Sequence, residues 1–168
     1  MNPHWLPDIV SKEKEETELQ YQGRLYQIFE NDFIFNTICC QQLHVKTKKF
    51  PETKGYPQAF IHLTTRQYEG NSERTPDPER RMRLKWIRAS IEHFGSCETC
   101  SYEKCDRPWV WENGKKIKIC LPNQHYLVVL GKRKNDLLLV TAFYIDRDHY
   151  FRKIEKEYNN PDFSKKIQ

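Results

Sequence analysis

Apolar residues recur at helical spacing in three stretches of the chain. The first stretch, over about residues 15–31, predicts a helix. Its apolar positions are Leu19, Leu25, Ile28 and Phe29. A second helix is expected to begin at Asp77, because Asp can cap a helix and the following proline fits the first turn, and to end near His93. An amphipathic pattern over about 148–158 predicts a third helix.

Apolar runs in the second half predict strands that follow one another as an antiparallel meander. Residues 115–121 alternate with a period of two, so one face of that strand is expected to be wet. Residues 125–131 and 137–145 are dense apolar runs that suit central strands. The short polar segment between them predicts a hairpin connection.

The region between the first two helices is mixed. Residues 43–45 are the expected centre of one strand, and prolines and a glycine predict a loop over 51–58. Residues 59–65 form a short apolar run, which we interpret as a strand or a strand-to-turn segment. Helical material followed by a meander and a last helix predicts an α+β fold with helices packed on a small sheet.

A chain of 168 residues fits one domain and can bury a core without disulfide bridges. We expect a loose, flexible arm over 1–14, a single domain over 15–160 and a tail over 161–168.

The charge balance is mildly basic, with 28 Lys and Arg against 23 Asp and Glu, for a net charge of +5. This bias suits RNA as a partner, although many ordinary surfaces carry the same charge. No apolar run approaches the roughly 20 residues that span a bilayer, and the first residues lack the features of a signal peptide. We therefore expect a cytoplasmic protein without a membrane partner. The sequence has no Gly-rich phosphate loop, no H-E-x-x-H motif and no acidic cluster of the two-magnesium kind.

His62 and Thr141 are the first candidates for chemistry. His62 stands between apolar neighbours, beside two threonines and Arg66. Histidine titrates near neutral pH, so it can act as a base or an acid. Thr141 interrupts an apolar run, where its hydroxyl could bind a phosphate oxygen. The alternatives are a packed histidine at a strand end and an ordinary β-forming threonine.

Cations are concentrated in the second predicted helix and just before it. Six fall within 15 residues, namely Arg74, Arg80, Arg81, Arg83, Lys85 and Arg88. The positions 81, 85 and 88 follow helical spacing, so their side chains could track a phosphate backbone. A charged, solvated helix face is the alternative. Among the aromatic residues, Tyr144 is a candidate for stacking on an unpaired base, or else for core packing.

Cysteines form a separate motif. Cys97, Cys100 and Cys105 have the spacing C-x2-C-x4-C within a loop over 93–107. Two thiolates at C-x2-C can bind one zinc ion, and the fourth ligand would be His93 or Cys120. Such a closed thiolate site would be structural, because it leaves no position for water. The alternative is a loop of reduced thiols without a metal.

Six segments, in order, carry a resemblance to a known family. They are FIHLTTR (60–66), RRMRLKWI (80–87), WVWE (109–112), GKKI (114–117), YLVVL (126–130) and LVTAFY (139–144), followed by a basic helix. The set resembles a phage- and mobile-element-associated branch of the barnase/EndoU/colicin/RelE-like nucleases, over about residues 20–160. The resemblance implies N-terminal helices and a small curved antiparallel sheet that holds RNA on its concave face. It also implies a metal-independent endoribonuclease that acts as a toxin on tRNA or mRNA, with an antitoxin or immunity protein as a further partner.

The resemblance also implies roles for individual residues. His62 would be the acid/base residue, and Thr141 would bind the scissile phosphate. Arg66, Arg81 and Lys85 are the candidates for the catalytic cation. Further RNA contacts are expected from Arg80, Arg88 and Tyr144. The cysteine-rich insertion departs from the family pattern. It would be either a zinc-stiffened loop that shapes substrate access or a sign that the site has another use.

Two other functions fit the same residues. A non-catalytic, zinc-stabilised nucleic-acid-binding module would use the cysteine motif and the basic helix without cleaving RNA. A phage accessory protein that binds a host enzyme would instead show an apolar surface patch.

Overall fold

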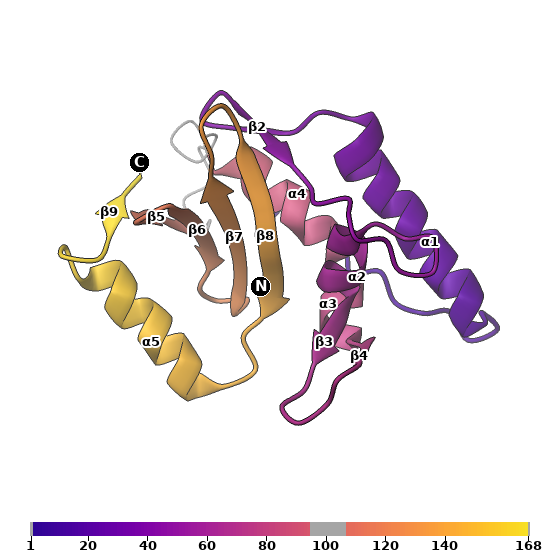
Figure 1. Ribbon diagram of the computed structural model, residues 1–168. Helices are drawn as coiled ribbons and strands as arrows, with labels where there is room; N and C mark the ends of the chain where they lie inside the picture. Colours follow the sequence, from indigo (N-terminus) through magenta and orange to yellow (C-terminus); the bar gives the residue numbers. More distant parts are fainter. Residues whose placement is uncertain (1, 95–106, 168) are drawn as a thin grey trace.

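The computed structural model describes residues 2–94 and 107–167, and these form a curled sheet with helices on both faces (Figure 1). The described helices are α1 (Glu18–Glu30), the π-helical turn η1 (Asn31–Phe35), α2 (Gln58–Thr64), α3 (Pro78–Met82), α4 (Leu84–His93) and α5 (Asp148–Asn159). The described strands are β1 (Cys39–Cys40), β2 (Leu43–Lys46), β3 (Thr65–Gln67), β4 (Arg74–Pro76), β5 (Trp109–Asn113), β6 (Lys116–Leu121), β7 (Tyr126–Lys132), β8 (Leu137–Tyr144) and β9 (Lys165–Lys166). The predicted α+β class is confirmed.

The main sheet has the strand order β1–β2–β8–β7–β6–β5–β9, and β3 pairs with β4 in a separate hairpin. The predicted meander is confirmed as β6, β7 and β8, which pair antiparallel. The sheet is mixed where we expected only antiparallel pairs, because β2 runs parallel to β8 over Val45↔Leu137 and Lys46↔Leu138. A register shift at Val129/Leu130 adds an irregularity to the β7–β8 pair.

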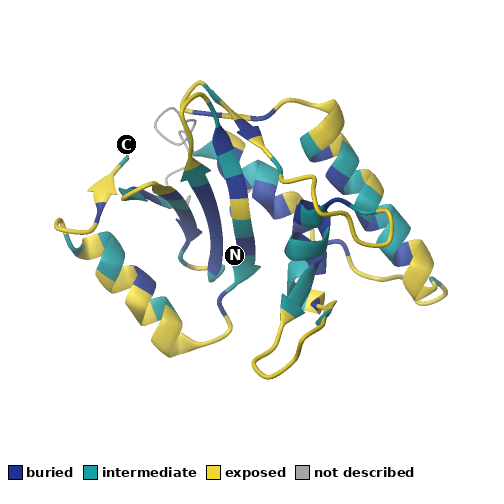
Figure 2. Cartoon of the chain, viewed as in Figure 1, coloured by how far each residue is buried: buried dark blue, intermediate teal, exposed yellow. Residues whose placement is uncertain are grey.

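Two hydrophobic clusters hold the helices to the sheet, one on each face. The larger cluster joins α1, α2 and α4 to side chains such as Ile119 and Val128. The smaller cluster lies under α5, where Ile154 packs near Leu127 and Val129. Neighbouring strand residues alternate between the two clusters, as the pleat requires. Figure 2 shows the result, with buried positions on β6 and β7 and exposed outer faces on α1 and α5.

The first helix begins at a capping box. The Thr17 side chain accepts a hydrogen bond from the Gln20 backbone, and the Gln20 side chain accepts one from the Thr17 backbone. This reciprocal pair satisfies two amides that have no partner within the helix. The predicted helix is confirmed, although Leu19 points to solvent and Tyr21 takes the buried position.

The N-terminal segment, expected to be a loose arm, lies against the core. Leu6 and Val10 are buried in the larger cluster. The amide of Val10 donates to the carbonyl of Met82 at 2.8 Å, and the Trp86 indole donates to the carbonyl of Pro7 at 2.8 Å. At the other end of the chain, the tail supplies the edge strand β9, which pairs with β5.

Two predictions of local structure are corrected. Residues 59–65, interpreted as a strand or a strand-to-turn segment, lie mainly in α2, where Ala59, Phe60 and Leu63 are buried on one side of the helix. The predicted second helix is divided at Arg83, whose φ of −101° and ψ of 16° lie outside the helical region. Its start is confirmed, since the Asp77 side chain accepts a hydrogen bond from the Arg80 amide at 3.1 Å.

A single carboxylate fastens α5 to the sheet. Glu157 accepts hydrogen bonds from Lys118 at 2.7 Å, from the Trp111 indole at 2.9 Å and from the Asn113 amide at 2.8 Å. Burial by itself would raise the pKa of Glu157, but these three donors outweigh it and hold the pKa below its usual value of 4.5. The ionised form is therefore the one that stabilises the fold.

Replacing this carboxylate should weaken the fold in a pH-dependent way. Glu157→Gln should lower the free energy of unfolding by about 1–3 kcal/mol at pH 7, because three donors lose a charged acceptor. The difference from wild type should shrink as the pH falls below 4.5, since protonation then removes the same charge from the wild type. Urea denaturation at several pH values measures it. Glu155→Gln, at an exposed position of the same helix, is the control; equal stability of the two variants at pH 7 would contradict the assignment.

Candidate active site

His62 lies in a small pocket between α2 and β8. The pocket has a volume of about 250 Å³ and is lined by Lys48, Gln58, Ala59, His62, Leu138, Leu139 and Val140. It exists because β2 pairs with only the first two residues of β8. The chain then leaves the sheet, and α2 lies against β8 instead of a further strand.

Burial and two arginines set the charge of His62. Burial is the larger cause, and Arg74 and Arg80 add to it, so that the pKa of His62 falls to about 4 from its usual 6.5. Both guanidinium groups donate to the carbonyl of His62 itself, at 3.5 Å from Arg74 and 2.7 Å from Arg80. The imidazole is therefore neutral at pH 7.

The arginines near His62 are held by a buried acid. Asp77 is 3% exposed, and its Oδ2 lies 2.9 Å from Nε of Arg66 and 3.8 Å from Nε of Arg80. A second acid, Asp146, accepts a hydrogen bond from Arg66 at 2.8 Å. Arg80 also lies over the Phe143 ring at 5.6 Å. These contacts hold the predicted cations Arg66 and Arg80 beside the later half of β8. The carboxylates also neutralise part of the positive charge of the two arginines.

Thr141 lies on β8 directly after the residues that line the His62 pocket. It is the cross-strand partner of Val129, which packs in the cluster under α5. Residues opposite each other in a sheet share a face, so the threonine side chain belongs to the α5 side. Further along the strand, Tyr144 is half-buried beneath the Arg83 guanidinium, 4.6 Å from its ring centre.

The predicted stripe of Arg81, Lys85 and Arg88 is not one open surface. Arg81 is buried, where it forms an ion pair with Glu18 and lies over the ring of Tyr21. Arg88 donates to the carbonyl of residue 32 in η1 and to those of residues 36 and 37 just after it. Lys85 is exposed on α4. Because the predicted helix is divided at Arg83, Arg81 lies on α3, whereas Lys85 and Arg88 lie on α4.

Two residues of the pocket were not found from the sequence. Lys48 lines it and is exposed. Gln58 lines it as well, and its buried Oε1 has no hydrogen-bond partner among the described residues. A buried acceptor that lacks a partner is uncommon in folded proteins. The lysine-rich run at 46–49 could have indicated that Lys48 belongs to a site, but a short basic run in a loop is common on ordinary surfaces.

The zinc prediction falls largely outside the described residues, because Cys97, Cys100 and Cys105 lie there. Of the two proposed fourth ligands, His93 stacks on Trp5 with ring centres 4.8 Å apart. Cys120 is fully buried under α5, and burial raises the pKa of its thiol to about 12. Within residues 2–94 and 107–167, no three His, Cys, Asp or Glu side chains gather in a group that could bind a metal ion.

No helix in the described part of the chain is both long and apolar enough to cross a bilayer.

The charge state of His62 can be measured directly. In a proton NMR titration, His62 should show a pKa near 4, below the usual 6.5 for histidine. Arg74→Gln should raise the pKa of His62, because it removes a nearby positive charge. Since the unfolded chain binds the proton more readily, His62 should also reduce stability as the pH falls from about 6.5 toward 4. A His62 pKa of 6 or above in the wild type would contradict this description.

Comparison with known proteins gives no further identification, since no protein-family model, no curated protein and no solved structure matches the chain.

Proposed function

We propose that the chain is a metal-independent endoribonuclease, and that His62 takes the proton from the 2′-hydroxyl of its RNA substrate. The observation that carries the proposal is the neutral imidazole of His62 in a pocket that also holds the cationic Lys48. A base and a cation beside one small cavity are what cleavage by a 2′-hydroxyl requires. The net charge of +5 suits an RNA substrate such as tRNA or mRNA.

The proposed reaction is an internal transesterification. The 2′-oxygen gives its proton to Nδ1 or Nε2 of His62 and attacks the adjacent phosphorus atom, while the bond from phosphorus to the 5′-oxygen breaks. The products are a 2′,3′-cyclic phosphate and a 5′-hydroxyl, and the 5′-oxygen takes up a proton from water or from the imidazolium. Lys48 stabilises the negative charge on the phosphorane. The Gln58 amide can bind the attacking hydroxyl or a phosphate oxygen.

Substrate binding would itself make His62 a stronger base. In the free protein, Arg74 and Arg80 contribute to the low pKa of the imidazole. A phosphate group placed between these cations and the ring would offset their field and raise the pKa toward the working pH. A general base is most effective when its pKa lies near that pH.

A non-catalytic RNA-binding module is the second candidate. The net charge of +5 suits it as well, and the pairing of Arg66 and Arg80 with Asp77 leaves these two cations less able to stabilise a phosphorane. This candidate would bind RNA in a salt-sensitive way without cutting it.

Cleavage of a labelled single-stranded RNA and of bulk tRNA, in EDTA, tests the proposal. Wild type should cut and leave 2′,3′-cyclic phosphate ends. His62→Ala should lower the rate by about 100-fold or more, the usual contribution of a general base. Lys48→Gln should lower it by about tenfold or more, as expected when a cation at the phosphate is lost. Thr141→Val should cut at the wild-type rate, because Thr141 lies on the α5 side of the sheet, whereas α2, which carries His62, packs on the other face.

His149→Ala, on the exposed surface of α5, is the matched histidine control and should cut at the wild-type rate. The proposal is wrong if EDTA abolishes cutting or if His62→Ala cuts as fast as wild type. RNA binding without cleavage by the wild type would establish the second candidate.

A further inference from the structure

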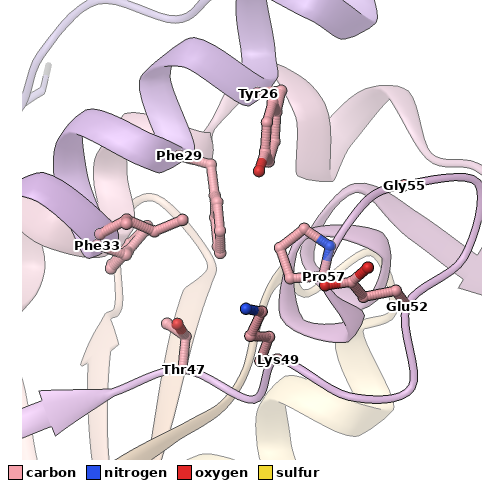
Figure 3. Close-up of a pocket in the computed structure, with 9 residues that line it drawn as sticks. Tyr26, Phe29, Phe33, Thr47, Lys49, Glu52, Gly55 and Pro57 are labelled. Carbon is pink, nitrogen blue, oxygen red and sulfur yellow. The ribbon is translucent and has the colours of Figure 1, made fainter.

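A second and larger pocket lies next to the His62 pocket. It has a volume of about 480 Å³, within the range of small-molecule sites. Four side chains of α1 and η1 line one part, and five residues of the segment before α2 line the rest (Figure 3). The lining residues are Tyr26, Phe29, Phe33, Ile34, Thr47, Lys49, Glu52, Gly55 and Pro57.

The lining combines aromatic surface with one cation. Phe29 is fully buried, whereas Phe33 and Tyr26 are half-buried at the sides. The Lys49 ammonium group and the Thr47 hydroxyl point toward the same space as the Tyr26 hydroxyl (Figure 3). Such a pocket suits a flat aromatic ring that carries an anionic group, because the ring meets apolar walls and the anion meets Lys49.

One short segment, residues 47–49, lines both pockets. Lys48 lines the His62 pocket, whereas Thr47 and Lys49 line the larger one. The amides of Gln58 and Ala59 donate to the carbonyls of Lys49 and Lys48, each at 2.9 Å, and hold this stretch against the start of α2. A chain of alternating phosphates and bases could therefore reach both pockets across residues 47–49.

We infer that the larger pocket binds an unpaired nucleobase of the RNA, with the phosphate of that nucleotide on Lys49. This inference rests on the proposed function, because it takes the neighbouring His62 pocket as the cleavage site. Unpaired bases are the parts of RNA that proteins bind by stacking on aromatic side chains. The next residue, Phe50, is 64% exposed and lies 5.2 Å from the Lys49 ammonium, so a further base could stack at the rim. The inferred substrate is single-stranded RNA, since a base within a duplex could not enter.

Titration of the full chain with adenosine 5′-monophosphate, followed by methyl NMR of Ile34, tests the pocket. The nucleotide should shift the Ile34 signals. Lys49→Gln should weaken binding by about fivefold to tenfold, as expected for the loss of one charged hydrogen bond at an exposed site. Phe33→Ala should weaken it by about tenfold through lost stacking. Glu52→Gln should strengthen it, because the variant removes the carboxylate among the lining residues.

Lys54→Gln is the matched control, because Lys54 is an exposed lysine of the same loop that does not line the pocket. It should bind the nucleotide as wild type does. Adenosine without phosphate separates the two parts of the site, since Lys49→Gln should affect its affinity little. The inference is overturned if Ile34 does not respond to the nucleotide, or if Lys49→Gln and Lys54→Gln bind it equally. A shift of the Ile34 signals by an apolar peptide without a phosphate, when the nucleotide causes none, would likewise overturn it in favour of a protein partner.

The RNA assay separates this inference from the proposed function. If both hold, Lys49→Gln should raise KM for single-stranded RNA with little change in kcat, whereas His62→Ala should lower kcat. RNA cleavage with an unchanged KM in Lys49→Gln would overturn the base-binding pocket and leave the nuclease intact. Nucleotide binding that depends on Lys49, in a protein that cuts no RNA, would support the pocket and overturn the nuclease.

Discussion

The parallel pairing of β2 with β8 over only two residues determines the arrangement of the candidate site. The chain leaves the sheet after Lys46, so the rest of that edge of β8 pairs with no strand in the described residues. An open edge exposes backbone groups that favour pairing with other chains, and covering it with a helix is one common solution. Here α2 lies against β8, and His62 is brought to the strand as a consequence.

Charged groups that the sequence offered for catalysis serve largely to assemble the fold. Arg81 joins α3 to α1 through Glu18, and Arg88 donates to the carbonyl of Asp32 in η1. Buried cations of this kind need acceptors, because an unpaired buried charge costs several kcal/mol. Asp77 has a double role, since it caps α3 and pairs with Arg66. Among the residues that line the His62 pocket, the exposed cation is Lys48, in a loop rather than on the predicted basic helix.

The neutral state of His62 follows from the same arrangement. Two guanidinium groups bind the carbonyl of His62, and their charge and the local burial both disfavour a second proton on the ring. The positive field beside the imidazole would also attract a phosphate. The same arginines therefore lower the pKa of His62 in the free protein and, under the proposed function, would favour an anion beside the ring.

Elements whose patterns extend over several turns or strands could be predicted from the sequence alone. The meander, α5, α1 and the cap at Asp77 were all predicted, because periodicity and capping are local signals. The nature of α2 could not be decided in this way. Its seven residues include β-branched Ile61 and Thr64, and so short an apolar run fits either a strand or a helix.

The contacts between side chains from distant segments could be seen only in the folded structure. The break at Arg83 divided a helix that the pattern predicted as continuous, and so separated Arg81 from Lys85. Lys48 and Gln58 joined His62 because α2 replaced a strand beside β8, a long-range contact that leaves no periodic trace in the sequence. Periodicity reports which face of an element is buried, whereas the partner that buries it is set by packing between segments far apart in the chain.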